Sequence, residues 1–148
     1  MSNRNIIALN AAAQNLIDSR EAYNEGAKLA VNKSATEVIA LSDRFRKRAA
    51  ERQALILDIQ NQIRSYGEFP TQDSSDVGEV RRDFEVFSKL FEKDETAALS
   101  AIDKGEADLA ETITDLLRNY SRLSQSTKRL LRQAYKDAKS RQRLSALH

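Results

Sequence analysis

Apolar residues in the first half of this chain recur at alternating steps of three and four, the spacing that places side chains on one face of an α-helix. Within residues 4–31 this stripe consists of Ile6, Leu9, Ala13, Leu16, Arg20, Tyr23, Ala27 and Ala30. Within residues 35–66 it consists of Val38, Leu41, Phe45, Arg48, Arg52, Leu55, Ile59, Gln62 and Tyr66. Neither range contains a proline, so the pattern predicts one long helix over each.

Three more helices are predicted after a turn-rich segment at residues 67–76, which we expect to be a flexible loop. The spacing of apolar residues predicts a short helix over 77–92, with one face formed by Val80, Phe84, Phe87 and Phe91. Asp94 is placed to cap a helix over 95–119, whose inner face consists of Leu99, Ile102, Glu106, Leu109, Ile113, Leu116 and Tyr120. The last predicted helix covers 124–146 and carries Leu130, Leu131, Ala134, Ala138 and Leu144.

Long helices with narrow apolar stripes bury those stripes best in a near-parallel bundle. We therefore predict an all-α fold, an up-down four-helix bundle in which the short helix is a crossover between the second and fourth elements. With 148 residues, the chain has the size of one domain, predicted over residues 1–148. No apolar run approaches the ~20 residues of a membrane span, and no signal-peptide core begins the chain. A cytoplasmic protein without membrane contact is expected.

The residue inventory excludes most catalytic centres. The chain contains no Cys, and its single His is the last residue, His148. Disulfide frameworks, thiolate metal sites and Ser-His-Asp or Cys-His groups are therefore not expected. Glycine-rich phosphate loops and the H-E-x-x-H motif are absent, as are the Glu-x-x-His pairs with which helical bundles bind two metal ions. We predict a protein without catalytic activity or cofactor.

Charged residues nevertheless occupy positions on the predicted inner faces. We expect these residues to form an interior ionic cluster of Arg20, Arg48, Arg52, Glu106 and Arg141. Burial of an ion costs several kcal/mol unless it is paired, so Glu106 should be held by an arginine, either Arg52 or Arg20. The neighbouring Gly105 suggests a close helix approach at that point. The alternative is that the stripes drift toward the surface and the long arginines extend into solvent.

Charge is unevenly distributed, although the formal net charge is only +2. Residues 68–115 hold 14 acidic and 5 basic side chains, whereas residues 118–143 hold nine basic side chains and one acidic. The first interpretation is that adjacent antiparallel helices of opposite charge complement each other along their flanks. The second is an anionic partner, such as nucleic acid, on the last helix, although aromatic residues for stacking and known DNA-binding motifs are missing. The third is a helix that is simply solvated.

The order of several short motifs resembles one known family. The motifs are Leu16-Ile17-Asp18 with Gly26, Arg52 followed by Asp58-Ile59, Gly67 with Pro70, Arg82 with Phe84, Lys104-Gly105-Glu106, and Arg143-Leu144 with Leu147. Together they resemble the bacterial ferritin-like family called domain of unknown function 2383, over about residues 5–147. The resemblance implies a ferritin-like bundle and supplies no established activity.

At five positions the chain departs from the pattern of that family. Asp18 stands in place of Glu, Arg81 in place of His, Phe84 in place of Trp, Ala107 in place of Asp, and Arg141 in place of the last His. Each change removes or shortens a possible ligand, and two of them introduce a cation. The resemblance therefore implies that any metal site of the relatives is degenerate here.

These observations lead to one main hypothesis and two alternatives. The main hypothesis is a non-catalytic, ferritin-like bundle with a structural or interaction role, including a stress-linked one, in which Arg/Glu pairing replaces a metal site. Its partner is an unknown protein or a second copy of the chain. The first alternative is a carboxylate-bridged dimetal site formed by Asp18, Glu21, Glu51, Glu106 and Asp137. The second is anion or nucleic-acid binding through the last helix.

Overall fold

A computed structural model describes residues 2–31, 36–71 and 77–140 of the chain. Within them the chain forms five α-helices and no strand: α1 (Ser2–Val31), α2 (Thr36–Ser65), α3 (Val77–Lys93), α4 (Glu95–Asn119) and α5 (Gln125–Ser140). The all-α prediction is confirmed, and the predicted helices agree with the observed ones in number and order. Residues 141–146, which were also expected to be helical, lie outside the described ranges.

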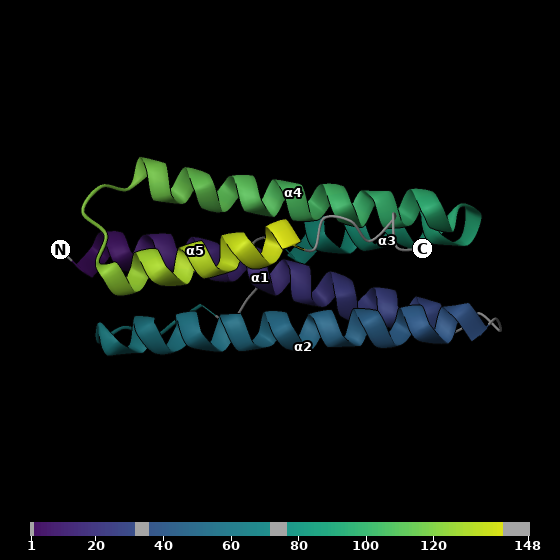
Figure 1. Cartoon of the computed structure of the whole chain (residues 1–148), viewed down its shortest axis with the longest axis horizontal. Coiled ribbons are helices and arrows are strands. Elements are labelled where there is room, and N and C mark those ends of the chain that lie inside the picture. The colour runs from purple at the N-terminus through teal and green to yellow at the C-terminus, as the bar shows by residue number, and fades with distance from the viewer. Residues whose placement is uncertain (1, 32–35, 72–76, 141–148) are drawn as a thin grey trace.

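The helices form an elongated bundle in which α1, α2 and α4 each occupy one position and α3 and α5 share a fourth (Figure 1). α1 and α2 make a long antiparallel pair, and α4 runs along the opposite side of the bundle. α5 and α3 follow each other along the remaining position: α5 packs on α1, α2 and α4, whereas α3 packs on α1 and α4. α3 does join α2 to α4, as predicted, but it lies in line with α5 rather than beside it, so these two helices share one position of the bundle.

The helix ends follow from local chemistry. Asp94 caps α4, because its Oδ1 accepts a hydrogen bond of 3.1 Å from the backbone N–H of Ala97. After α2, Gly67 adopts a φ of 85°, which a residue with a Cβ rarely adopts, and the chain turns there. The backbone N–H of Thr71 then donates to Asn10 Oδ1 at 3.1 Å, which holds the start of the loop against α1.

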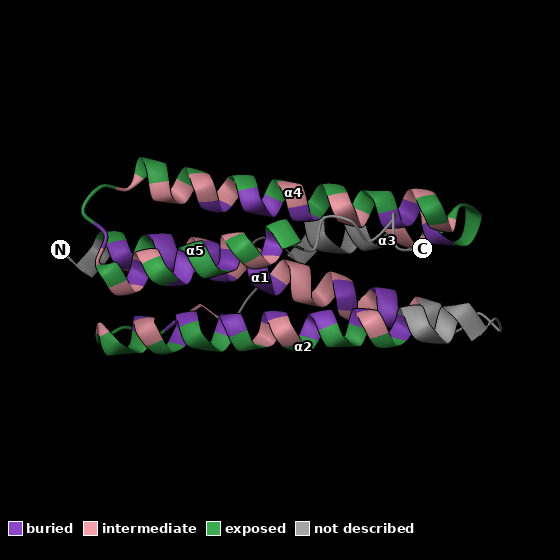
Figure 2. Ribbon diagram, viewed as in Figure 1, coloured by how far each residue is buried: buried purple, intermediate pink, exposed green. Residues whose placement is uncertain are grey.

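The buried hydrophobic side chains form two clusters. Buried positions occur along the length of α1, α2, α4 and α5 (Figure 2). The larger cluster lies among α1, α2, α4 and α5 and includes Leu16, Ile56, Ile59, Ile113 and Leu131. The smaller cluster lies among α1, α2, α3 and α4 and consists of Tyr23, Ala27, Phe45, Ala49, Phe91, Ala98 and Leu99. α5 thus closes one cluster and α3 closes the other.

Two glycines within helices have opposite surroundings. A Cβ added at Gly26 would lie 3.0 Å from the Phe45 ring, so this glycine permits a close approach of α1 and α2. At Gly105 no atom would lie within 4 Å of an added Cβ. The predicted close approach at Gly105 is therefore wrong, because that face of α4 is open to solvent.

Candidate functional site: an interior ionic cluster

The guanidinium of Arg52 connects all four positions of the bundle. Arg52 extends from α2 and its side chain is only 1% exposed. Its Nη2 forms an ion pair with Glu106 Oε2 on α4, and its Nε lies 2.9 Å from Asp137 Oδ2 on α5. Its Nη1 donates to Ser19 Oγ on α1 at 3.2 Å. One cation therefore lies between two carboxylates near the centre of the bundle.

Tyr23 and Arg48 extend this arrangement toward the smaller hydrophobic cluster. The hydroxyl of Tyr23 donates to Glu106 Oε1 at 2.7 Å, so both oxygens of that carboxylate have a donor. Arg48 Nη1 donates to the Tyr23 oxygen at 3.1 Å, and its guanidinium carbon lies 5.6 Å from the centre of the Tyr23 ring. Tyr23, Arg48, Arg52, Glu106 and Asp137 together form the interior ionic cluster of the folded chain.

The charges of the cluster stabilise one protonation state. Burial alone would lower the pKa of Arg52, but Glu106, Tyr23 and Asp137 raise it, and the net shift is upward. Burial raises the pKa of the Tyr23 hydroxyl well above its ordinary value, and the adjacent Glu106 carboxylate raises it further. The guanidinium therefore stays charged and the phenol stays neutral at any pH at which a cell lives.

The structure brings together only part of the cluster predicted from the sequence. Arg48, Arg52 and Glu106 lie side by side, and Arg141 lies outside the described residues. Arg20 does not reach Glu106: its side chain is 24% exposed and binds Glu21 Oε1 at 2.8 Å and Gln53 Oε1. The expectation for Arg20 was therefore wrong, because the outer edge of the α1–α2 interface supplies it with partners.

The five carboxylates of the dimetal alternative are dispersed. Asp18, Glu21 and Glu51 are only partly buried, and Glu21 is paired with Arg20. Glu106 and Asp137 do approach each other, but the guanidinium of Arg52 lies between them. Among the residues that the structure describes, no three His, Cys, Asp or Glu side chains are grouped so as to hold a metal ion.

The opposite charges of α4 and α5 are not joined by direct ion pairs between the described residues of these helices. In the described part of the chain, no ion pair is formed by the five cations of α5, which are Lys128, Arg129, Arg132, Lys136 and Lys139. The only acid of this helix, Asp137, is paired with Arg52 instead. The first interpretation of the charge distribution stays a prediction, since attraction between the two helices does not require direct ion pairs.

A family model matches most of the chain. The model of the domain of unknown function family 2383 covers residues 5–119. The chain belongs to this family. No curated protein and no solved structure matches it.

The domain of unknown function 2383 match begins within the first turn of α1, at residue 5, and ends where α4 ends. Tyr23, Arg48, Arg52 and Glu106 thus lie within the matched residues of this family member, whereas Asp137 lies beyond them. No helix in the described ranges has the length and apolar composition needed to span a membrane.

Two contributors to the ionic cluster of this family member were not identified from the sequence. Tyr23 was assigned to an apolar face, although a buried tyrosine hydroxyl normally has a hydrogen-bond partner, and this was the available signal. Asp137 was considered as a metal ligand rather than as a partner of Arg52. The signal in its case was that it is the only acid in a strongly basic helix.

Proposed function

We propose that this chain is a non-catalytic helical-bundle protein with a structural or interaction role, in which an ionic cluster stands where ferritin-like proteins hold two metal ions. The observation that carries the proposal is the position of the Arg52 guanidinium between the carboxylates of Glu106 and Asp137. Ferritin-like sites use inward carboxylates from facing helices, which these two residues resemble in placement.

The same guanidinium argues against the dimetal alternative. A divalent cation at this place would meet a buried positive charge within a few ångströms, and like charges repel strongly in a low-dielectric interior. The two carboxylates are balanced in charge by the guanidinium groups of Arg52 and Arg48, which keep their protons under all working conditions. The cluster therefore supplies packing and charge balance rather than a reactive centre.

Elemental analysis tests this proposal. The protein is purified without chelator from a culture supplemented with iron and manganese, and its metal content is measured by mass spectrometry. The expected result for wild type is far less than one metal ion per chain. Iron or manganese at one or two ions per chain, lost in an Asp137→Asn variant, would overturn the proposal in favour of the dimetal alternative.

A further inference from the structure

The outer face of α4 carries an acidic stripe, defined as Asp108, Glu111 and Asp115. These residues follow each other at steps of three and four, so they lie on one side of the helix. All three are exposed, and they lie on the side opposite Leu109 and Ile113, which are buried. Asp115 has one weak partner, Arg118, at 4.0 Å.

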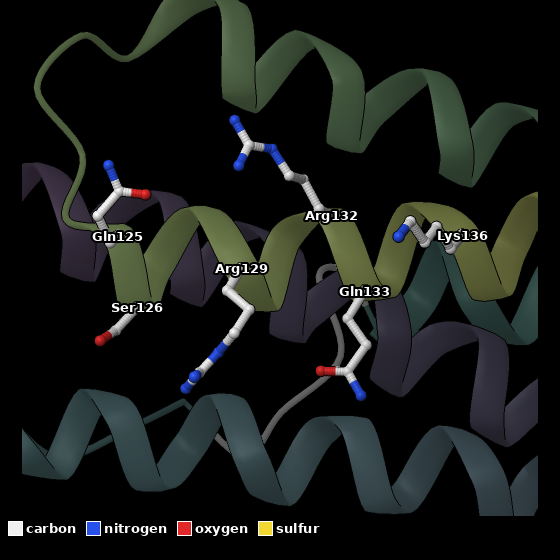
Figure 3. Close-up of a pocket in the computed structure, with 6 residues that line it drawn as sticks. All are labelled: Gln125, Ser126, Arg129, Arg132, Gln133 and Lys136. Atoms are coloured by element: carbon white, nitrogen blue, oxygen red, sulfur yellow. The ribbon is translucent and has the colours of Figure 1, made fainter.

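The outer face of α5 carries a basic stripe, defined as Arg129, Arg132 and Lys136. These residues are also exposed, and they line an open groove of about 560 Å³ together with Gln125, Ser126 and Gln133. Figure 3 shows the Arg132 side chain extending toward α4 and the Arg129 side chain extending toward α2. Because these cations diverge, they do not surround a single small anion and instead suit an extended, charged partner.

The interior ionic cluster sets the two stripes at the same height along the bundle. Arg52 binds both Glu106 on α4 and Asp137 on α5, and these neighbouring helices run in opposite directions. Glu111 follows Glu106 by five residues and Arg132 precedes Asp137 by five. At about 1.5 Å of rise per residue, both residues lie about 7.5 Å from Arg52 along the bundle axis, and in the same direction from it.

The other members of the stripes agree in the same way. Asp108 lies about 3 Å from the level of Arg52 and Lys136 about 1.5 Å from it. Asp115 and Arg129 lie about 13.5 Å and 12 Å from it. Each acid is therefore level with one cation to within about 1.5 Å, although the two stripes point outward from different helices and form no ion pair with each other.

We propose that a second copy of this chain docks on the face formed by α4 and α5, related to the first by a two-fold axis parallel to the helices. A rotation of 180° about this axis places α4 of one copy opposite α5 of the other. It leaves the position of every residue along the direction of the helices unchanged. The acidic stripe of each copy then lies against the basic stripe of the other, with each of the three acids level with a cation. Two-fold contacts of this kind use the same patch on both copies.

The neighbouring acidic stripe disfavours a nucleic acid on the same face. Packed helices lie 8–10 Å apart, which is about one Debye length at physiological salt. A phosphodiester backbone on α5 would therefore be repelled by Asp108, Glu111 and Asp115. A second copy instead matches both stripes at once, and the chain as a whole has a net charge of only +2.

Complementary charge reversal tests the proposal. One triple variant, Asp108→Lys, Glu111→Lys and Asp115→Lys, makes both stripes basic; the other, Arg129→Glu, Arg132→Glu and Lys136→Glu, makes both acidic. Masses are measured by analytical ultracentrifugation in ~50 mM salt, where surface charges are weakly screened. Wild type should show twice the monomer mass of 16.7 kDa. Each variant alone should show the monomer mass, and an equimolar mixture should recover the doubled mass.

The mixture separates lost docking from lost folding, because misfolded variants would not recover a defined complex. A control triple variant, Lys47→Glu, Arg64→Glu and Lys89→Glu, changes exposed cations on α2 and α3 by the same total charge and should remain dimeric. A monomeric wild type in ~50 mM salt, or a mixture that stays monomeric, would overturn the proposal. Binding of a labelled DNA duplex by a monomeric wild type would assign the basic stripe to nucleic acid instead. The result does not depend on the metal content measured above.

Discussion

Replacing Arg52 by methionine should lower the free energy of unfolding by about 3–5 kcal/mol, because it removes the buried cation that pairs with Glu106 and Asp137. The side chains of Arg52 and Glu106 are 1% and 4% exposed, so water replaces little of the lost interaction. Methionine preserves most of the apolar stem, and the packing change contributes little. The loss is large relative to the 5–15 kcal/mol total stability typical of a domain.

The Glu106→Gln variant should lose less, about 2–3 kcal/mol, because glutamine keeps the shape of the side chain. Its Oε1 still accepts a hydrogen bond from Arg52, and its amide N–H can donate to the Tyr23 oxygen. Arg52 also retains Asp137 as a counter-charge in that variant. The double variant should lose less than the sum of the two single losses, by about 1–3 kcal/mol, because both changes remove the same pair.

The assay is urea unfolding of wild type, the two single variants and the double variant. It is carried out at one protein concentration and in high salt, so that association between copies does not contribute. Glu25→Gln is the control, because the Lys28–Glu25 pair is exposed and its loss should cost ~1 kcal/mol or less. Losses below about 1 kcal/mol for both Arg52→Met and Glu106→Gln would refute the reasoning.

Two further predictions follow from the pKa of Tyr23 and from the two helical glycines. The pKa of Tyr23 is raised from 10.0, so its contribution to stability is present below about pH 10 and is lost as the pH rises above that value. Between about pH 9 and 11, unfolding free energy should therefore fall less steeply in Tyr23→Phe than in Tyr120→Phe, and equal slopes would contradict this. Gly26→Ala should destabilise the protein by about 1 kcal/mol through the contact with Phe45. Gly105→Ala should stabilise it by up to about 1 kcal/mol. The midpoint temperatures of thermal unfolding should therefore shift in opposite directions for the two variants, and shifts in the same direction would contradict the argument.

The helices of this chain could be predicted from the sequence because each depends on local signals. The apolar periodicity, the cap at Asp94 and the turn at Gly67 are all formed by residues a few positions apart. The arrangement of α3 and α5 in one position of the bundle was not predicted. It depends on which long helices each of them contacts, and apolar spacing within a helix does not report that.

The ionic cluster could be predicted only in part, for a related reason. A charge on an apolar stripe indicates that a partner is needed, and this led to the expectation for Glu106. It does not indicate whether the partner is Arg52 or Arg20, since both lie near the middle of their helices. The outcome depends on the rotation of each helix: Arg52 points into the centre, whereas Arg20 lies at the edge beside Glu21.

The position of Arg52 also explains how helices that pack through largely apolar inner faces keep one register relative to each other. Helices with only small and aliphatic side chains inside can shift along each other by one turn, about 5.4 Å, at modest cost. A shift of α5 by one turn would separate Asp137 from Arg52 and break this ion pair of the bundle interior, which costs several kcal/mol. A shift of α4 would have the same effect on Glu106. The ionic cluster thereby fixes the relative height of α4 and α5, and with it the level at which the acidic and basic stripes on their outer faces meet a second copy.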